Sequence, residues 1–162
     1  MYSVYLETTV PSYLAANPSR DLIVAAHQQI TREWWQDARD RFELFISEAV
    51  VAEIRMGDPG ASARRLQLVR DLPRLELNDD VRSLVELYDK KLGLATRAKV
   101  DVLHIAFAVG YRLDYLVTWN CNHIANGEVV RRLQQLNREI DQPTPLILTP
   151  EELSLGALGE KT

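Results

Sequence analysis

The sequence predicts a single-domain α/β protein, an α/β/α sandwich with a central, mostly parallel sheet. Three observations support this class. The chain has 162 residues, of which 46% are hydrophobic, enough for one sizeable core but not for two full domains. Short β-prone runs alternate with helical patterns, as in parallel sheets covered by helices on both faces. Polar residues follow several of the expected strands, at the sheet edge where such folds collect ligands.

The first third of the chain predicts strand, helix, helix, strand and helix. Residues 4–6 are β-prone, and Pro11 suits the first turn of a helix. Apolar residues at helical spacing predict a long amphipathic helix over residues 21–40. Residues 42–46 are apolar enough for a buried strand, and Ser47 is a good N-cap for a helix that ends near the breaker at 57–60.

The remaining chain continues the alternation without a repeat or a linker. Its helices are bounded by glycines, prolines and capping residues, and its strands by polar turns. We expect helices at 61–72, 81–92, 96–109 and 129–140, strands at 115–118 and 146–148, and the start of a helix at 149–152.

Charge and composition exclude several classes of protein. A net charge of -4 argues against a protein that holds nucleic acid by bulk electrostatics, so any such contact must be local. The single cysteine, Cys121, forms no intramolecular disulfide and no cysteine-based zinc site. Neither a signal peptide nor an apolar run of about 20 residues is visible, so we expect a cytoplasmic protein outside the membrane.

Acidic and amide side chains follow three of the expected strands. Glu7 follows the first strand, residues 47–53 the second, and Asn120 the strand at 115–118. Parallel strands end at one edge of a sheet, so these segments should meet there. Asp101, in an apolar stretch, needs a metal or hydrogen bonds if it is buried, and it reaches the same edge only if its helix is suitably tilted.

Each candidate also has a purely structural interpretation. Glu7 alone would be a solvated strand end, and an Asn such as Asn120 often forms a turn after a strand. Asp114 precedes its strand and belongs to the opposite edge. His104 and His123 are expected as core residues or as neighbours of the site rather than as metal ligands, so zinc is not expected. A dinucleotide-binding site is excluded because no glycine follows the first strand.

Four segments together resemble the PIN-domain family and, more narrowly, VapC-type toxins of bacterial toxin–antitoxin pairs. The resemblance runs from Tyr2 to about Leu153, and it depends on the order and spacing of the segments rather than on any single motif. The segments are Glu7-Thr8-Thr9, Ser47 with Glu53 six positions on, Asp101 to Ala106, and Leu116 to Ile124.

The resemblance implies a PIN-like nuclease domain over residues 1–153 and a C-terminal tail over 154–162. Its acidic positions fall on Glu7, Glu53, Asp101 and, as Asp or Asn, Asn120, with Thr8 in a supporting position. Family members use Mg²⁺ or Mn²⁺ to hydrolyse phosphodiester bonds in RNA. Glu7, Glu53 and Asp101 would hold the metal, and all four residues would be catalytic. Glu7 replaces the usual Asp, and Asn120 leaves three carboxylates, which favours one ion over two.

The resemblance also implies partners. A small antitoxin should cover the site. The Trp34-Trp35 pair is typical of a core anchor or of an interface, and we expect a homodimer or antitoxin surface there. Basic pairs at 64–65, at 97 and 99, and at 131–132 are candidates for local contacts with the phosphates of single-stranded RNA. Each pair taken alone is typical of a solvated helix face.

Glu48, the other acid near Glu53, is explained without catalysis, because an acid in the first turn of a helix interacts favourably with its dipole. The alternative function is a catalytically silent PIN-fold binding or assembly protein.

Overall fold

The computed structural model describes residues 1–154, which form five strands, seven α-helices and one 3₁₀ turn. Apart from Ser154, the expected tail therefore lies outside the described residues. In chain order the elements are β1 (Tyr2–Leu6), α1 (Thr9–Ala15), α2 (Leu22–Arg41), β2 (Phe42–Ser47), α3 (Glu48–Arg55), α4 (Pro59–Val69), β3 (Arg74–Leu75), α5 (Asp79–Lys91), η1 (Thr96–Ala98), α6 (Lys99–Gly110), β4 (Tyr115–Val117), α7 (Gly127–Glu139) and β5 (Leu146–Leu148).

The five strands form one parallel sheet in the order β3-β2-β1-β4-β5, which confirms the predicted fold class. β1 lies in the centre, where Val4 pairs with Leu44 of β2 and with Tyr115 of β4. Because all strands run the same way, the residues after β1, β2 and β4 emerge at one edge of the sheet, called the carboxyl edge below.

Side-chain caps explain where several helices begin. The Asp21 carboxylate accepts hydrogen bonds from the backbone of the first turn of α2, and the Ser47 hydroxyl accepts one at the start of α3. Asn78 and Asn126 cap α5 and α7 in the same way. These local signals are readable in sequence, so the predicted helices at 21–40 and after Ser47 are confirmed.

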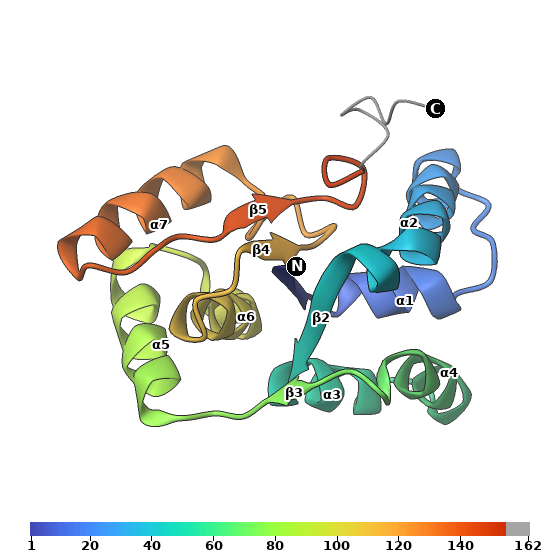
Figure 1. Cartoon of the computed structure of the whole chain (residues 1–162), viewed down its shortest axis with the longest axis horizontal. Helices are drawn as coiled ribbons and strands as arrows, with labels where there is room; N and C mark the ends of the chain where they lie inside the picture. Colours follow the sequence, from blue (N-terminus) through green and yellow to red (C-terminus); the bar gives the residue numbers. More distant parts are fainter. Residues whose placement is uncertain (155–162) are drawn as a thin grey trace.

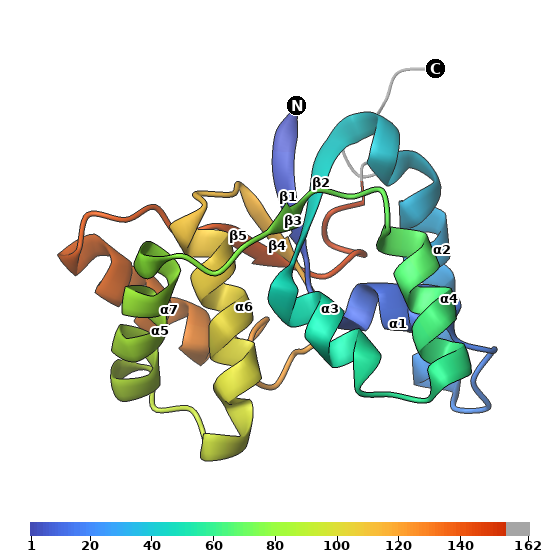
Figure 2. The same ribbon diagram turned by 90° about the horizontal axis from the view of Figure 1, so that it is seen from below.

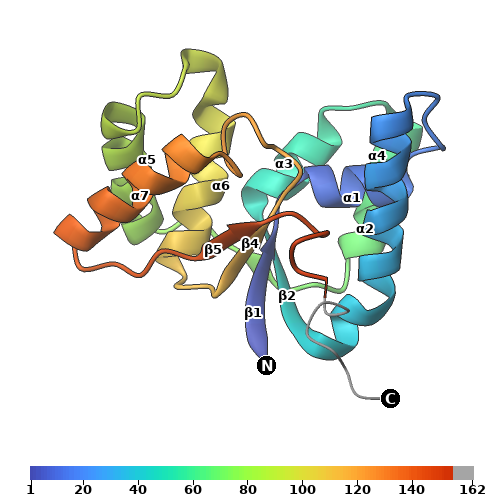
Figure 3. The ribbon, with the colours of Figure 1, turned by 90° about the horizontal axis from the view of Figure 1, so that it is seen from above.

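The helices form two groups on either side of the strands. Figures 1, 2 and 3 show α5, α6 and α7 gathered on one side and α1, α2, α3 and α4 on the other. α6 is the most buried helix, since most of its side chains from Val102 to Val109 lie in the core. It packs against α3 and β4 and so connects the two groups.

The structure differs from the predicted elements in three places. β3 was not expected; it pairs with the end of β2, where the Ile46 amide donates to the carbonyl of Pro73 at 3.1 Å. The helix expected at 96–109 is divided into η1 and α6. Residues 150–153 form a single turn instead of a helix. Within residues 1–154, no helix has the length and hydrophobicity needed to cross a bilayer.

Candidate active site

Glu7 is a buried carboxylate at the end of β1, with 3% of its surface exposed. Its Oε2 accepts three hydrogen bonds: from the Thr9 amide at 3.1 Å, the Thr9 hydroxyl at 2.5 Å and the Thr118 hydroxyl at 2.8 Å. These donors offset the cost of removing a carboxylate from water. Oε1 accepts none of these bonds and lies 4.0 Å from His104 Nε2, so one oxygen is fixed while the other faces the neighbouring side chains.

Glu53, in the last turn of α3, brings a second carboxylate to the same place. Its Oε1 accepts a hydrogen bond from the Thr8 hydroxyl at 2.6 Å and a very short one from His104 Nε2. Burial raises the pKa of the Glu53 carboxyl, but the hydrogen bonds from His104 and Thr8 oppose it, and the pKa lies below its ordinary value. Glu53 is therefore held as a carboxylate.

A buried hydrogen-bonded chain fixes His104, which has no exposed surface. Tyr5 Oη lies 2.6 Å from His104 Nδ1 and 2.7 Å from Ser47 Oγ, which accepts from the Val50 amide at 3.4 Å. If Ser47 donates to Tyr5 and Tyr5 donates to Nδ1, every group has a partner and Nε2 donates to Glu53. Burial, together with the nearby carboxylates, raises the pKa of Tyr5 well above its ordinary value, despite its hydrogen bond with Ser47.

Glu7, Glu53 and His104 form a compact group that a metal ion could join. One ligand atom from each lies within 4.8 Å of the others, and this is the one such group of three or more among the described residues. His104 Nε2 contacts Glu53 Oε1 and lies 4.0 Å from Glu7 Oε1. Because both ring nitrogens of His104 already have hydrogen-bond partners, the ring holds Glu53 in position, and the carboxylate oxygens are the available ligands.

Asp101, in the first turn of α6, lies in a second cluster. Asp101 Oδ1 accepts from Asn120 Nδ2 at 3.0 Å, and Oδ2 lies 2.9 Å from His123 Nδ1. The backbone amide of Asn120 donates to the Thr118 hydroxyl at 2.9 Å, and that hydroxyl donates to Glu7. Thr118 therefore links the two clusters. Asp101 reaches the carboxyl edge from the first turn of α6, because the side chains that it contacts, Asn120 and His123, follow β4.

The structure thus divides the predicted site into two linked clusters. Glu7, Glu53 and Thr8 lie together, whereas Asp101 and Asn120 are paired with each other. The exposed Glu48 lies apart, where it accepts a hydrogen bond from the Leu77 amide at 3.0 Å. Glu53, which the resemblance selects over Glu48, is thus the one of the two that lies beside Glu7.

Asp114 lies at the opposite edge, as expected. Its Oδ2 accepts from the Ser3 amide and hydroxyl, both at 2.8 Å, which joins the start of β1 to the residue before β4. These two hydrogen bonds lower the pKa of the Asp114 carboxyl. The hydrogen bonds between Asp114 and Ser3 give this acid a structural role in the sheet, separate from the candidate site.

Sequence interpretation missed the contacts of His104, Thr9 and Thr118. His104 follows Asp101 by three positions, a spacing that puts both on one helix face, and Thr118 is the first residue after β4. This spacing and this position are visible in the sequence, but neither shows which carboxylate His104 or Thr118 binds.

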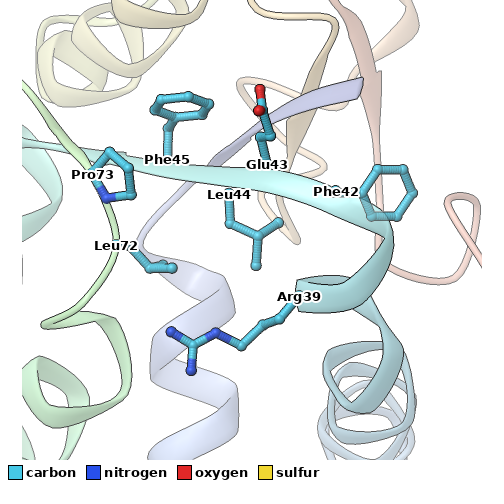
Figure 4. Close-up of a pocket in the computed structure, with 7 residues that line it drawn as sticks. All are labelled: Arg39, Phe42, Glu43, Leu44, Phe45, Leu72 and Pro73. Atoms are coloured by element: carbon cyan, nitrogen blue, oxygen red, sulfur yellow. The ribbon is translucent and has the colours of Figure 1, made fainter. Parts of the chain in front are cut away.

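A separate pocket of about 270 Å³ lies beside β2, away from these clusters. Figure 4 shows Arg39, Leu44 and Leu72 on one side of the strand, with Glu43 and Phe45 pointing to the other. None of the predicted site residues lines this pocket. The clusters of acidic residues at the carboxyl edge therefore form the candidate active site.

The parallel sheet with acidic side chains at its carboxyl edge defines an α/β protein with a metal-site candidate. Among solved structures, the chain is similar to VapBC2 from Rickettsia felis, bound to a DNA fragment from its promoter, with a TM-score of 0.56 and 15% sequence identity over 90% of this chain and 97% of the other. It is also similar to VapBC-1 from nontypeable Haemophilus influenzae, with the same TM-score and identity over 91% of this chain and 97% of the other. No protein-family model and no curated protein matches the sequence.

These similarities confirm the predicted resemblance to VapC-type toxins at the level of the fold. The chain has the fold found in these VapBC complexes over nearly its whole described length.

Proposed function

We propose that this protein is a divalent-metal-dependent endoribonuclease that cleaves single-stranded RNA and is the toxin of a type II toxin–antitoxin pair. The observation that carries the proposal is the pair of carboxylates, Glu7 and Glu53, held within 4.8 Å of each other at the carboxyl edge of a fold shared with VapBC structures. An arrangement that only stabilised the fold would not need two acids so close together.

The donor atoms fit a hard divalent cation. Carboxylate oxygens are the preferred ligands of Mg²⁺ and Mn²⁺, and Glu7 leaves Oε1 outside its hydrogen bonds to threonine. Glu7 and Glu53, with Asp101 as the third carboxylate, would hold the ion. His104 would keep Glu53 oriented through Nε2. An ion bound there would supply positive charge for a phosphate and lower the pKa of a water molecule.

The other polar side chains would keep the carboxylates in position during the reaction. Thr9 and Thr118 hold one oxygen of Glu7, and Thr8 holds Glu53. Asn120 donates to Asp101 and accepts from the His123 amide, so both ends of its side-chain amide are used. We therefore assign Asn120 a positioning role for Asp101, in addition to the catalytic role that the resemblance implies.

Local cations would compensate for the acidic total charge. Arg97 and Lys99 are exposed, stand just before Asp101, and form no ion pair within the described residues. In contrast, Arg131 and Arg132 both bind Glu128, which leaves less of their charge for a phosphate. Arg97 and Lys99 are therefore the better candidates for contact with the RNA backbone.

A small antitoxin is the proposed protein partner, because both similar solved structures are VapBC complexes. An antitoxin segment over the carboxyl edge would neutralise the carboxylates if it placed an arginine on them. Expression of this chain alone should arrest growth, and a short reading frame encoded beside it should restore growth. A homodimer stays a prediction, which sedimentation of the purified protein tests.

Metal binding is tested first, by thermal melting. Mn²⁺ or Mg²⁺ should raise the melting temperature of the wild type, since a ligand that binds only the folded state stabilises it. Glu53→Gln and Asp101→Asn should abolish this rise. Glu48→Gln, the same change on the same helix but outside the cluster, should keep it. A wild type that shows no response to either metal contradicts the metal site and favours the catalytically silent binding protein.

Cleavage is tested with single-stranded RNA and enzymes purified identically. Asp101→Asn should lose activity, whereas Asp114→Asn, at the opposite edge of the sheet, should cleave as the wild type does. Equal cleavage by the wild type and Asp101→Asn would indicate a contaminating ribonuclease and refute the proposal.

A further inference from the structure

Three aromatic rings stack beside the acidic cluster. Tyr13 comes from α1, His27 from α2, and Trp119 from the segment after β4. The rings of His27 and Trp119 are 4.0 Å apart between centroids and 12° from parallel. The Tyr13 ring lies 6.4 Å from His27 and 6.2 Å from Trp119, at 24° and 28°. Figure 3 shows α1 and α2 side by side, and their contact brings these residues of distant segments together.

The stack is joined directly to the candidate active site. The Trp119 amide donates to the Thr9 hydroxyl at 2.9 Å, and that hydroxyl donates to Glu7 Oε2 at 2.5 Å. On its other side, Trp119 Nε1 donates to the Thr31 hydroxyl at 2.7 Å. Trp119 is therefore held by its backbone amide and by its indole nitrogen, and the backbone amide is two hydrogen bonds from Glu7, a proposed metal ligand.

The other two rings are only half-buried and carry unused polar atoms. Within residues 1–154, the hydroxyl of Tyr13 and the two ring nitrogens of His27 make no hydrogen bond, although Trp119 beside them is bonded. Rings that only filled the core would be covered, and their polar atoms would be paired. Partly exposed parallel rings with free donors and acceptors are instead suited to a flat heterocycle that has polar edges.

We propose that the half-buried rings of Tyr13 and His27, with the buried Trp119 behind them, form a platform that stacks an unpaired nucleobase of the RNA, next to the phosphate at Glu7 and Glu53. This inference rests on the proposed function, which supplies RNA as the ligand. A base held in a duplex could not leave its partner to lie on the rings, so the platform favours single strands. Tyr13 and His27 are positioning residues: they bind the substrate beside the reacting phosphate and take no part in the bond cleavage.

The test is the affinity for a short fluorescent oligoribonucleotide, measured by anisotropy with Ca²⁺ in place of Mg²⁺. Tyr13→Leu and His27→Leu should each raise Kd at least about fivefold, because stacking on one aromatic side chain is worth a factor of this size or more. Tyr13→Phe keeps the ring and should bind within about twofold of the wild type. Tyr2→Leu removes an exposed tyrosine at the opposite edge and should change nothing.

An oligonucleotide that lacks its bases separates stacking from general damage to the fold. The wild type, Tyr13→Leu and His27→Leu should bind this abasic strand equally, because only its phosphates remain. Equal affinity of the wild type and both leucine variants for the normal strand overturns the platform. If the wild type binds in this platform-dependent way but does not cleave, the ribonuclease proposal fails while the platform stands. If it cleaves and the variants bind unchanged, only the platform fails.

Discussion

The buried hydroxyl of Tyr5 gives the sharpest test of the network behind Glu53. Tyr5→Phe removes one oxygen and keeps the ring, which packs with no exposed surface against Phe107. The change leaves His104 Nδ1 without its donor and the Ser47 hydroxyl without its acceptor. Each buried polar group that is deprived of its partner costs about 1–3 kcal/mol, and partial relaxation reduces the sum. We expect a decrease of about 2–3 kcal/mol in the free energy of unfolding.

Urea denaturation in EDTA at neutral pH measures this decrease without stabilisation by a bound metal. The m-value should stay unchanged, since the same surface is exposed on unfolding. Tyr111→Phe is the matched control, because its hydroxyl donates to the carbonyl of Glu76 at an exposed position where water replaces it; the expected change is within about 0.5 kcal/mol. A decrease below about 1 kcal/mol for Tyr5→Phe would refute the proposed chain of hydrogen bonds.

Three further outcomes follow from the structure. Gly110→Ala should destabilise the protein by about 1–3 kcal/mol in urea denaturation, because its Cβ would lie 2.9 Å from the Cγ2 of Val81, a side chain with no exposed surface; an unchanged midpoint would contradict this close approach. Replacing Arg97 and Lys99 together by alanine should weaken RNA binding and reduce the slope of log K against log salt by about 0.7 for each phosphate that is no longer neutralised; an unchanged slope would show that the two side chains do not bind phosphates. The lowered pKa of Glu53 stabilises the metal-free fold above the ordinary glutamate pKa of about 4.3, and this contribution disappears as pH falls through the lowered value. Glu53→Gln should therefore lose less stability than the wild type on acidification, and parallel stability curves would contradict the shift.

Local signals in the sequence determined most of the fold. Asp21 and Ser47 cap their helices through backbone atoms two or three residues away, so the chain encodes these helix starts without tertiary help. The alternation of strands and helices then indicated a parallel sheet, and the polar residues after the strands indicated the edge of the candidate site. Residues that follow a parallel strand lie at the carboxyl edge, and residues that precede one lie at the opposite edge. Glu7 and Asn120 were therefore expected at the carboxyl edge and Asp114 at the opposite one.

The tertiary structure alone decided which side chains meet. His104 and Glu53 are 51 residues apart in sequence, and His104 contacts Glu53 because α6 packs against α3. Asp101 likewise contacts Asn120 and His123 because the start of α6 packs against the segment after β4. Helical spacing places a residue on a face of its own helix, but it carries no information about the neighbour that the face will meet.

The short strand β3 and the aromatic platform show the same limit. β3 has two residues and is held by its pairing with β2, so no propensity could reveal it. The rings of Tyr13, His27 and Trp119 come from three elements and become parallel only when α1, α2 and the end of β4 are assembled. The sequence by itself determined the elements, their order and the edge where the acids lie. Packing between distant segments determined the hydrogen bonds that orient those acids, because such contacts exist only after the chain has folded.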